Sequence, residues 1–293
     1  MKGIKMVSFL IMFFFISYTH VWAARAKIGI PTFENKARVD RSVADSFVDM
    51  LTTAFVKSRK FDVIERSSLS KIANEQALGA SGAISADSAA QIGKLAGVSY
   101  MVIGIISQLG YSKKNIGAFG VHVSRTEASI GIDIRLVDTT TGKIMLAESF
   151  TKKKNATGIG GGYVNVDLSS GPLSELAREI CNEIVKKVMF TVYPPKVVKV
   201  KGNNVMINYG ESVISKGQVY TVFKKGEELI DPDTGESLGA EEEEVGTVKI
   251  TRVTAKFSVG EILNSKQPIK AGMLLRPREV TKKKYAPKVK VPW

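Results

Sequence analysis

Few side chains in this sequence could carry out catalysis. Of its two histidines only His122 lies beyond residue 23, and its single cysteine is Cys181. Nucleophilic catalysis needs a nucleophile paired with a base, so a Ser-His-Asp or Cys-His site would depend wholly on His122. A zinc site lacks ligands in the same way. We therefore expect a protein that is not an enzyme, with no catalytic residue, no metal and no cofactor.

Two short segments resemble ion-binding or phosphate-binding loops in composition. The "GIGGG" of residues 158–162 lacks the Gly-Lys-Ser/Thr ending of a phosphate loop and does not join a strand directly to a helix. The "DPDTGE" of residues 231–236 offers Asp231, Asp233 and Glu236 to a calcium ion, but it lacks the fifth and twelfth ligand positions of a calcium loop. We interpret the first as a flexible turn and the second as a tight β-turn.

The N-terminal residues predict an exported protein. Lys2 and Lys5 precede an apolar run containing "FLIMFFFIS", and Val21 and Ala23 are small residues at the usual positions before a cleavage point. An uncleaved membrane anchor is the alternative, but the run is short for a spanning helix. We expect residues 1–23 to be a signal peptide, and the mature chain to be periplasmic, either soluble or associated with the outer membrane.

The charge balance is strongly basic, with 42 lysines and arginines against 28 acidic residues. In a cytosolic protein this balance would suggest a nucleic-acid partner, but export removes that partner. Anionic envelope surfaces are one remaining explanation, and a merely solvated surface is the other. The lone Cys181 lies within a helical pattern, so we expect a buried thiol and no disulfide framework.

Residues 24–192 have the pattern of an α/β domain. The segment 98–107, "VSYMVIGIIS", is nearly all apolar, which indicates a central strand covered on both faces. The order of elements is strand, helix, strand, two helices, three strands and a last helix that begins near Pro172. We expect a mixed sheet with flanking helices.

Within this domain, residues 117–138 predict two strands joined by a short polar turn. Their alternating apolar residues fit a hairpin that lies on a soluble core, and they also fit a hairpin that crosses an outer membrane. We take this hairpin as a candidate membrane or interface element. Its residues are Phe119, Val121 and Val123 on the first strand, and Ile130, Ile132 and Ile134 on the second.

Helical periodicity ends at Pro194 and Pro195, which stiffen a short link. Residues 193–278 have the pattern of strands separated by turns rich in Gly, Asn and Asp, and we expect a small closed β-barrel of five or six strands. Residues 279–293 show no periodicity and predict a basic, flexible tail.

Most of the first domain resembles the CsgG family, which includes the curli secretion channel of the outer membrane. The resemblance lies in three motifs that follow one another in a specific order: F-x-V-I-E-R at 61–66, A-G-V-x-Y-x-V-x-G at 96–104 and R-L-V-D-T-T-T-G at 135–142. The family's channel members form a ring in which each subunit donates two hairpins to a shared outer-membrane barrel. The resemblance implies a homo-oligomer with other envelope assembly proteins as partners and with outer-membrane association. Because the chain is expected to be exported, we expect no nucleic-acid partner.

The chain departs from the channel pattern near its N-terminus. The family channel is a lipoprotein, whereas no cysteine follows this signal peptide. In the channel a loop before the first helix narrows the pore, and here that loop would fall at residues 31–41. It is short, and of the residue types expected it carries only Phe33 and Asn35.

The two hairpin regions, at about 113–130 and 150–170, are also short for the channel form, because a tilted spanning strand needs about 9–11 residues. The second region places Lys152, Lys153 and Lys154 at mid-strand, and a lysine that faces lipid at mid-depth costs roughly 2–4 kcal/mol. We therefore favour a soluble hairpin over a membrane-spanning one.

The C-terminal half carries a second resemblance. Residues 197–277, notably "GEELIDPDTGESLGAEEEEVGTVKITRVTAKFS", are similar to the C-terminal domain of the flagellar assembly protein FlgT. The resemblances together imply a non-enzymatic envelope component that helps to assemble or secrete a curli-like surface polymer, with a ring oligomer as one form. The alternative is a soluble periplasmic scaffold for flagellar or other envelope machinery.

Overall fold

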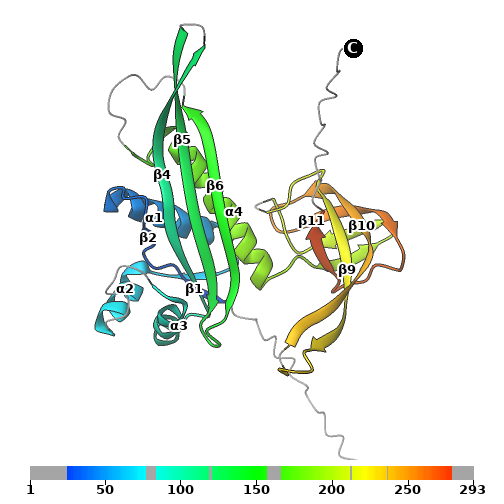
Figure 1. Cartoon of the computed structure of the whole chain (residues 1–293). Helices are drawn as coiled ribbons and strands as arrows, with labels where there is room; N and C mark the ends of the chain where they lie inside the picture. Colours follow the sequence, from blue (N-terminus) through cyan, green and yellow to red (C-terminus); the bar gives the residue numbers. More distant parts are fainter. Residues whose placement is uncertain are drawn as a thin grey trace, which may run out of the picture.

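The computed structural model of the chain describes residues 25–76, 84–118, 121–156, 166–211, 213–235 and 237–278 (Figure 1). Some of the predictions from the sequence therefore fall outside the described residues: the signal peptide at 1–23, Phe119, the glycine-rich segment at 158–162, Glu236 and the basic tail at 279–293.

The N-terminal part of the chain forms a mixed sheet with the strand order β3-β1-β4-β5-β6. β1 runs parallel to β3 and β4, whereas β4, β5 and β6 form an antiparallel meander, and the short β2 pairs with β4. This mixed sheet confirms the fold class predicted for residues 24–192. The strands are β1 (Lys27–Gly29), β2 (Glu34–Asn35), β3 (Asp62–Ile64), β4 (Tyr100–Ala118), β5 (Val121–Asp138) and β6 (Ile144–Ala156).

Within the described residues, four helices flank this sheet. α1 (Arg41–Ser58) and α4 (Gly171–Val192) pack against each other and share one apolar core with the sheet. α2 (Arg66–Glu75) and α3 (Ala86–Leu95) enclose a smaller core. Alternate residues of β4 enter the two cores, Val102 the first and Met101 the second. The central strand is thus covered on both faces where it lies between the helices, as its apolar run predicts.

The position of the hairpin turn differs from the prediction. β5 is one strand from Val121 to Asp138, and Ala118 pairs with Val121, so the chain reverses between these two residues. The polar segment from Ser124 to Glu127 continues the strand and is not the turn. A partly exposed strand has the same polar composition as a turn, and Thr126, buried within this segment, extends the alternation of the buried residues that follow it.

The C-terminal part forms a six-stranded sheet with the order β12-β9-β10-β11-β8-β7. The first and last strands of this order, β12 and β7, lie close to each other at one end. Val197 N–H donates to Met273 O at 2.8 Å, and Gly272 N–H donates to Val197 O at 2.8 Å. Closure of this sheet into a barrel stays a prediction. The strands are β7 (Val197–Lys201), β8 (Asn204–Ile207), β9 (Val219–Ile230), β10 (Ser237–Val253), β11 (Ser258–Ser265) and β12 (Leu274–Pro277).

Tyr209 joins the two parts of the chain. Its hydroxyl donates to Tyr193 O at 2.5 Å, just beyond the end of α4, and its ring meets Phe190 edge-on at 5.5 Å between centroids. The ammonium group of Lys60 lies 4.4 Å from the centre of the Tyr209 ring. Burial of the tyrosine raises the pKa of its hydroxyl. Separate folding of residues 24–192 and 193–278 stays a prediction.

Candidate functional site

The β4–β5–β6 meander is the most extended feature of the N-terminal sheet. β4 has 19 residues, β5 has 18 and β6 has 13, and the β4–β5 pairing is continuous apart from one irregularity near Ser107. Figure 1 shows the far end of the β4–β5 hairpin reaching beyond the helices. β6 ends the strand order, so within the described residues its outer edge has no strand beside it. A long hairpin next to a free edge is a surface that can pair with another chain.

A row of ion pairs holds β6 against α4. Alternate residues of a strand share a face, and residues four apart share a face of a helix, so the two sets of charges meet. The carboxylate of Glu183 is the main cause that raises the pKa of Lys152. The pairs are Lys152 with Glu179 at 3.0 Å and with Glu183 at 2.6 Å, Lys187 with Glu148 at 2.7 Å, and Lys154 with Glu175.

Lys153 pairs across the sheet with Glu127 at 3.5 Å. All three lysines of the second hairpin region therefore have carboxylate partners within the same chain. Each exposed pair contributes little stability, about 0–1 kcal/mol. The pairs between β6 and α4 together fix the position of the inner face of β6 against the helix.

The candidate hairpin residues that the structure describes lie in two different parts of β5. Ile130, Ile132 and Ile134 are all buried in the core shared with α1 and α4, so the structure brings these three together. Val121 and Val123 belong to β5 and pair with Ala118 and Ile116, respectively. A membrane or interface role for the hairpin stays a prediction.

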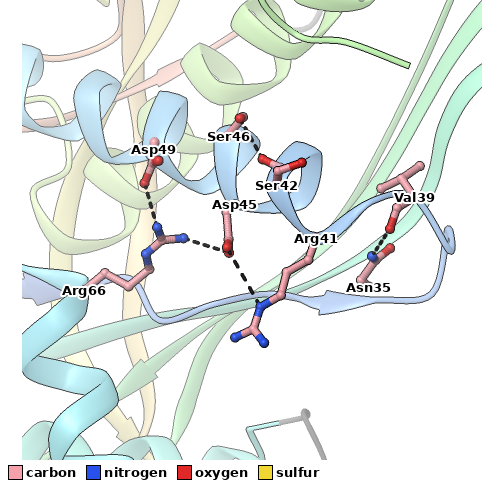
Figure 2. Close-up of polar contacts among 8 residues, drawn as sticks. All are labelled: Asn35, Val39, Arg41, Ser42, Asp45, Ser46, Asp49 and Arg66. Carbon is pink, nitrogen blue, oxygen red and sulfur yellow. Dashed lines mark hydrogen bonds and ion pairs between the residues drawn. The ribbon is translucent and has the colours of Figure 1, made fainter. Parts of the chain in front are cut away.

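The residues expected in the pore-narrowing loop are packed inside the subunit. Phe33 is only 2% exposed, and its ring lies 6.2 Å from that of Phe47. It also covers Gly104, where an added Cβ would overlap with the Phe33 ring. The Asn35 side-chain amide donates to Val39 O at 2.7 Å (Figure 2). The segment that contains Phe33 and Asn35 therefore packs along β4, and the ring of Phe33 is part of the core.

The F-x-V-I-E-R motif joins two helices through its arginine. Arg66 is the first residue of α2, and its guanidinium reaches Asp45 at 2.9 Å and Asp49 at 3.3 Å, both on α1 (Figure 2). Asp45 also lies 4.0 Å from Arg41. A planar guanidinium can bind two carboxylates at once, so this residue type suits a bridge between helices.

The R-L-V-D-T-T-T-G motif builds the β5–β6 turn. The carboxylate of Asp138 accepts hydrogen bonds from the backbone N–H groups of Thr140 at 2.8 Å and Thr141 at 3.0 Å. The Thr139 hydroxyl donates to Val98 O at 2.5 Å, which ties this turn to the A-G-V-x-Y motif. Gly142 has a φ of 75°, which glycine adopts without strain. The three motifs that carry the resemblance therefore build the frame of the subunit.

The sequence model of the family described as curli production assembly/transport component CsgG matches residues 19–212. The chain belongs to the CsgG family. No curated protein sequence matches the chain. The resemblance of residues 197–277 to the C-terminal domain of FlgT has no support from these comparisons and stays a prediction.

Solved structures with a similar arrangement have low sequence identity to this CsgG-family chain. The hypothetical protein CT253 from Chlamydia trachomatis is 12% identical, with a TM-score of 0.41, and the match covers 58% of this chain and 99% of that one. Lipoprotein GNA1162 from Neisseria meningitidis is 13% identical, with a TM-score of 0.37, and the match covers 56% of this chain and 97% of that one. The PelC dodecamer from Paraburkholderia phytofirmans is 14% identical, with a TM-score of 0.34, and the match covers 57% of this chain and 87% of that one. At these values the likeness assigns no function.

The residues that the sequence offered for catalysis or ion binding lie in the core, in a strand and in a turn. Cys181 is buried, and desolvation raises the pKa of its thiol to about 12, so the reactive thiolate is suppressed. His122 lies in β5 opposite Gly117. Asp231 accepts backbone hydrogen bonds from Asp233 at 2.8 Å and from Thr234 at 3.0 Å, which makes the predicted turn.

Among the residues that the structure describes, no group of three or more His, Cys, Asp or Glu side chains is placed to hold a metal ion. None of the helices in the described ranges is both long enough and apolar enough to cross a membrane. Sequence reasoning missed the ion pairs between β6 and α4. The spacing of Glu175, Glu179 and Glu183 on a helix was the available signal, but the sequence did not reveal which strand would face it.

Proposed function

We propose that this protein is a non-enzymatic component of the cell envelope that helps to assemble or secrete a surface polymer, and that it acts as a ring of identical subunits. The observation that carries the proposal is membership of the CsgG family over residues 19–212. The family assignment makes the chain an envelope-exported, assembly-associated protein. The curli-like cargo, the ring and the periplasmic face of the outer membrane as its location are our proposal.

The form of the subunit supports this proposal. Its family motifs hold helices, strands and turns together, and the buried Cys181 is poorly suited to nucleophilic chemistry. The long β4–β5 hairpin is one feature that a neighbouring copy can use. The outer edge of β6, which has no strand beside it in the part of the chain that the structure describes, is another. Such features suit a protein that works by assembly.

The test is the oligomeric state and location of the exported chain. We expect native mass spectrometry and electron microscopy to show a closed ring for the chain that starts at Ala24. A variant that lacks residues 113–125 should lose the ring or its association with the outer membrane, whereas a variant that lacks the tail 279–293 serves as the matched control. A full-length chain that is monomeric in both membrane and soluble extracts would contradict the proposal.

A soluble periplasmic scaffold at the flagellar basal body is the second candidate. The resemblance of residues 197–277 to the C-terminal domain of FlgT, which is itself a prediction from the sequence, is what favours it. Carbonate extraction of outer membranes separates the two candidates, because a scaffold is released and a membrane-seated ring stays. Deletion of the gene should then abolish surface polymer in the first case and motility in the second.

A further inference from the structure

A groove of about 480 Å³ lies between α1 and α4. Its apolar lining includes Met50 and Ala54 of α1 and Val185 of α4. Three cationic side chains surround it, and they are Lys57, Arg178 and Lys186. The groove therefore combines an apolar surface with positive charge.

Within the described part of the chain, the cations around the groove have little compensating negative charge. Asp49 also borders the groove, but it is paired with Arg66. Within the described residues, Lys57, Arg178 and Lys186 form no ion pair with a carboxylate. Lys186 lies 5.6 Å from the centre of the Phe190 ring. Burial lowers the pKa of its ammonium group, and the carboxylate of Glu183 offsets this shift only in part. A carboxylate supplied from outside would relieve that unfavourable burial of charge.

The opposite combination lies at the far end of the β9–β10 hairpin. Leu229, Ile230 and Leu238 are 51%, 54% and 65% exposed, so three large aliphatic side chains stand in solvent there. We call these three residues the hairpin tip. Figure 1 shows this end of the hairpin projecting away from the rest of its sheet.

The far part of the hairpin that carries the tip is strongly acidic, whereas Lys224 and Lys225 of β9 lie nearer its base. Residues 226–248 contain nine Asp and Glu and no Lys or Arg, although the whole chain has a net charge of +14. Glu227 and Glu228 precede the tip directly, and Asp231 and Asp233 follow Ile230. Exposed apolar residues flanked by one sign of charge are typical of an interaction surface.

We propose that the hairpin tip of one subunit docks into the α1–α4 groove of the next copy of this chain. The two surfaces match in both respects, because each is apolar at its centre and their charges are opposite. The tip is exposed in its own subunit, so the groove of the same chain does not cover it. A contact between two different surfaces of identical chains is head-to-tail, and its repetition closes a ring when the rotation allows. This inference rests on the proposed ring and names the contact that builds it.

A lipid surface fits the tip less well. The acidic residues beside the tip would be repelled by anionic lipid headgroups. The groove alone could accept the acyl chain and acidic headgroup of an anionic amphiphile, and this occupant is one outcome of the test below. Only a second copy explains the tip and the groove together.

The first experiment reverses charges and measures association of the exported chain by sedimentation velocity. We expect Arg178→Glu and Glu227→Arg each to weaken subunit association at least tenfold, because each places like charges across the contact. The chain that carries both substitutions should regain association. Lys94→Glu on α3 makes the same change of charge away from the groove and is the matched control.

The second experiment tests proximity directly. The buried Cys181 is unreactive, so Leu238→Cys with Ala54→Cys should cross-link between subunits when a short bismaleimide is added. Leu238→Cys with Leu95→Cys is the control pair, because Leu95 is exposed on α3 outside the groove.

The results distinguish this inference from the proposed function. Rings that persist in both charge-reversal variants, with no cross-link between residues 238 and 54, would overturn the docking contact and leave the ring intact. Rings that persist while Arg178→Glu releases a co-purified amphiphile would assign the groove to that amphiphile and also overturn it. A wild-type chain that never associates would overturn the ring and the contact together.

Discussion

The packing of Phe33 against Gly104 gives the sharpest test of whether residues 31–41 form core or line a pore. Phe33→Ala removes a ring that is 2% exposed and that contacts Phe47 and the backbone of β4. Truncation of a buried phenylalanine to alanine costs about 3–5 kcal/mol. This loss is a large part of the roughly 5–15 kcal/mol that stabilises a typical domain. Urea unfolding of the chain from residue 24, followed by far-UV circular dichroism, measures it.

A double-mutant cycle shows that the contact itself is responsible. Gly104→Ala alone would place a Cβ against the Phe33 ring, closer than van der Waals contact allows, and such overpacking costs about 1–3 kcal/mol. In the Phe33→Ala background that clash is absent, so the second substitution should cost little. We therefore expect a favourable coupling of about 1–3 kcal/mol between the two sites.

The matched control is Phe257→Ala, which truncates a ring that is 37% exposed and should change stability much less. If Phe33→Ala leaves the urea midpoint unchanged and the cycle shows no coupling, the phenylalanine does not pack on β4. The pore-lining role that the family resemblance implies would then be the better explanation.

Further predictions follow from three buried residues. Tyr209→Phe should lower stability by about 0.5–1.5 kcal/mol in a thermal melt, because it removes the hydrogen bond to Tyr193 O; an unchanged melting temperature would argue against this contact. Cys181 should resist alkylation at pH 8 until the chain unfolds, and a fast reaction in the native state would contradict its burial. Its raised pKa also contributes stability that is complete below about pH 9 and is lost as the pH rises towards 12, because the unfolded thiol ionises first. Ile132→Asp should cost several kcal/mol and Ile132→Val only about 0.5–1.5 kcal/mol, and two similar urea midpoints would show that this side chain does not face the core.

Much of the N-terminal fold follows from local patterns. The apolar run at 98–107, the helical repeats and Pro172 near the start of α4 predict a mixed sheet with flanking helices, and the structure contains them. The one clear error was the hairpin turn, which the polar residues 124–127 suggested. The polarity of a segment reflects its exposure to solvent, and a strand that is partly exposed can be as polar as a turn.

The family motifs show what a sequence can and cannot indicate about a site. Their order was sufficient to indicate the family, because each motif is a local signature of a strand end, a helix start or a turn. Their roles depend on partners far along the chain, such as Asp45 for Arg66 and Val98 for Thr139. A local pattern does not identify such partners.

The sequence alone determined the elements, their approximate order, the basic charge and the shortage of catalytic groups. Only the tertiary structure decided that the lysines of β6 meet the glutamates of α4. It also placed three cations around the α1–α4 groove and left the aliphatic hairpin tip exposed beside acidic residues. The physical reason is range. Helix, strand and turn preferences act over a few residues, whereas an ion pair or a groove is made by segments that only the packed core brings together.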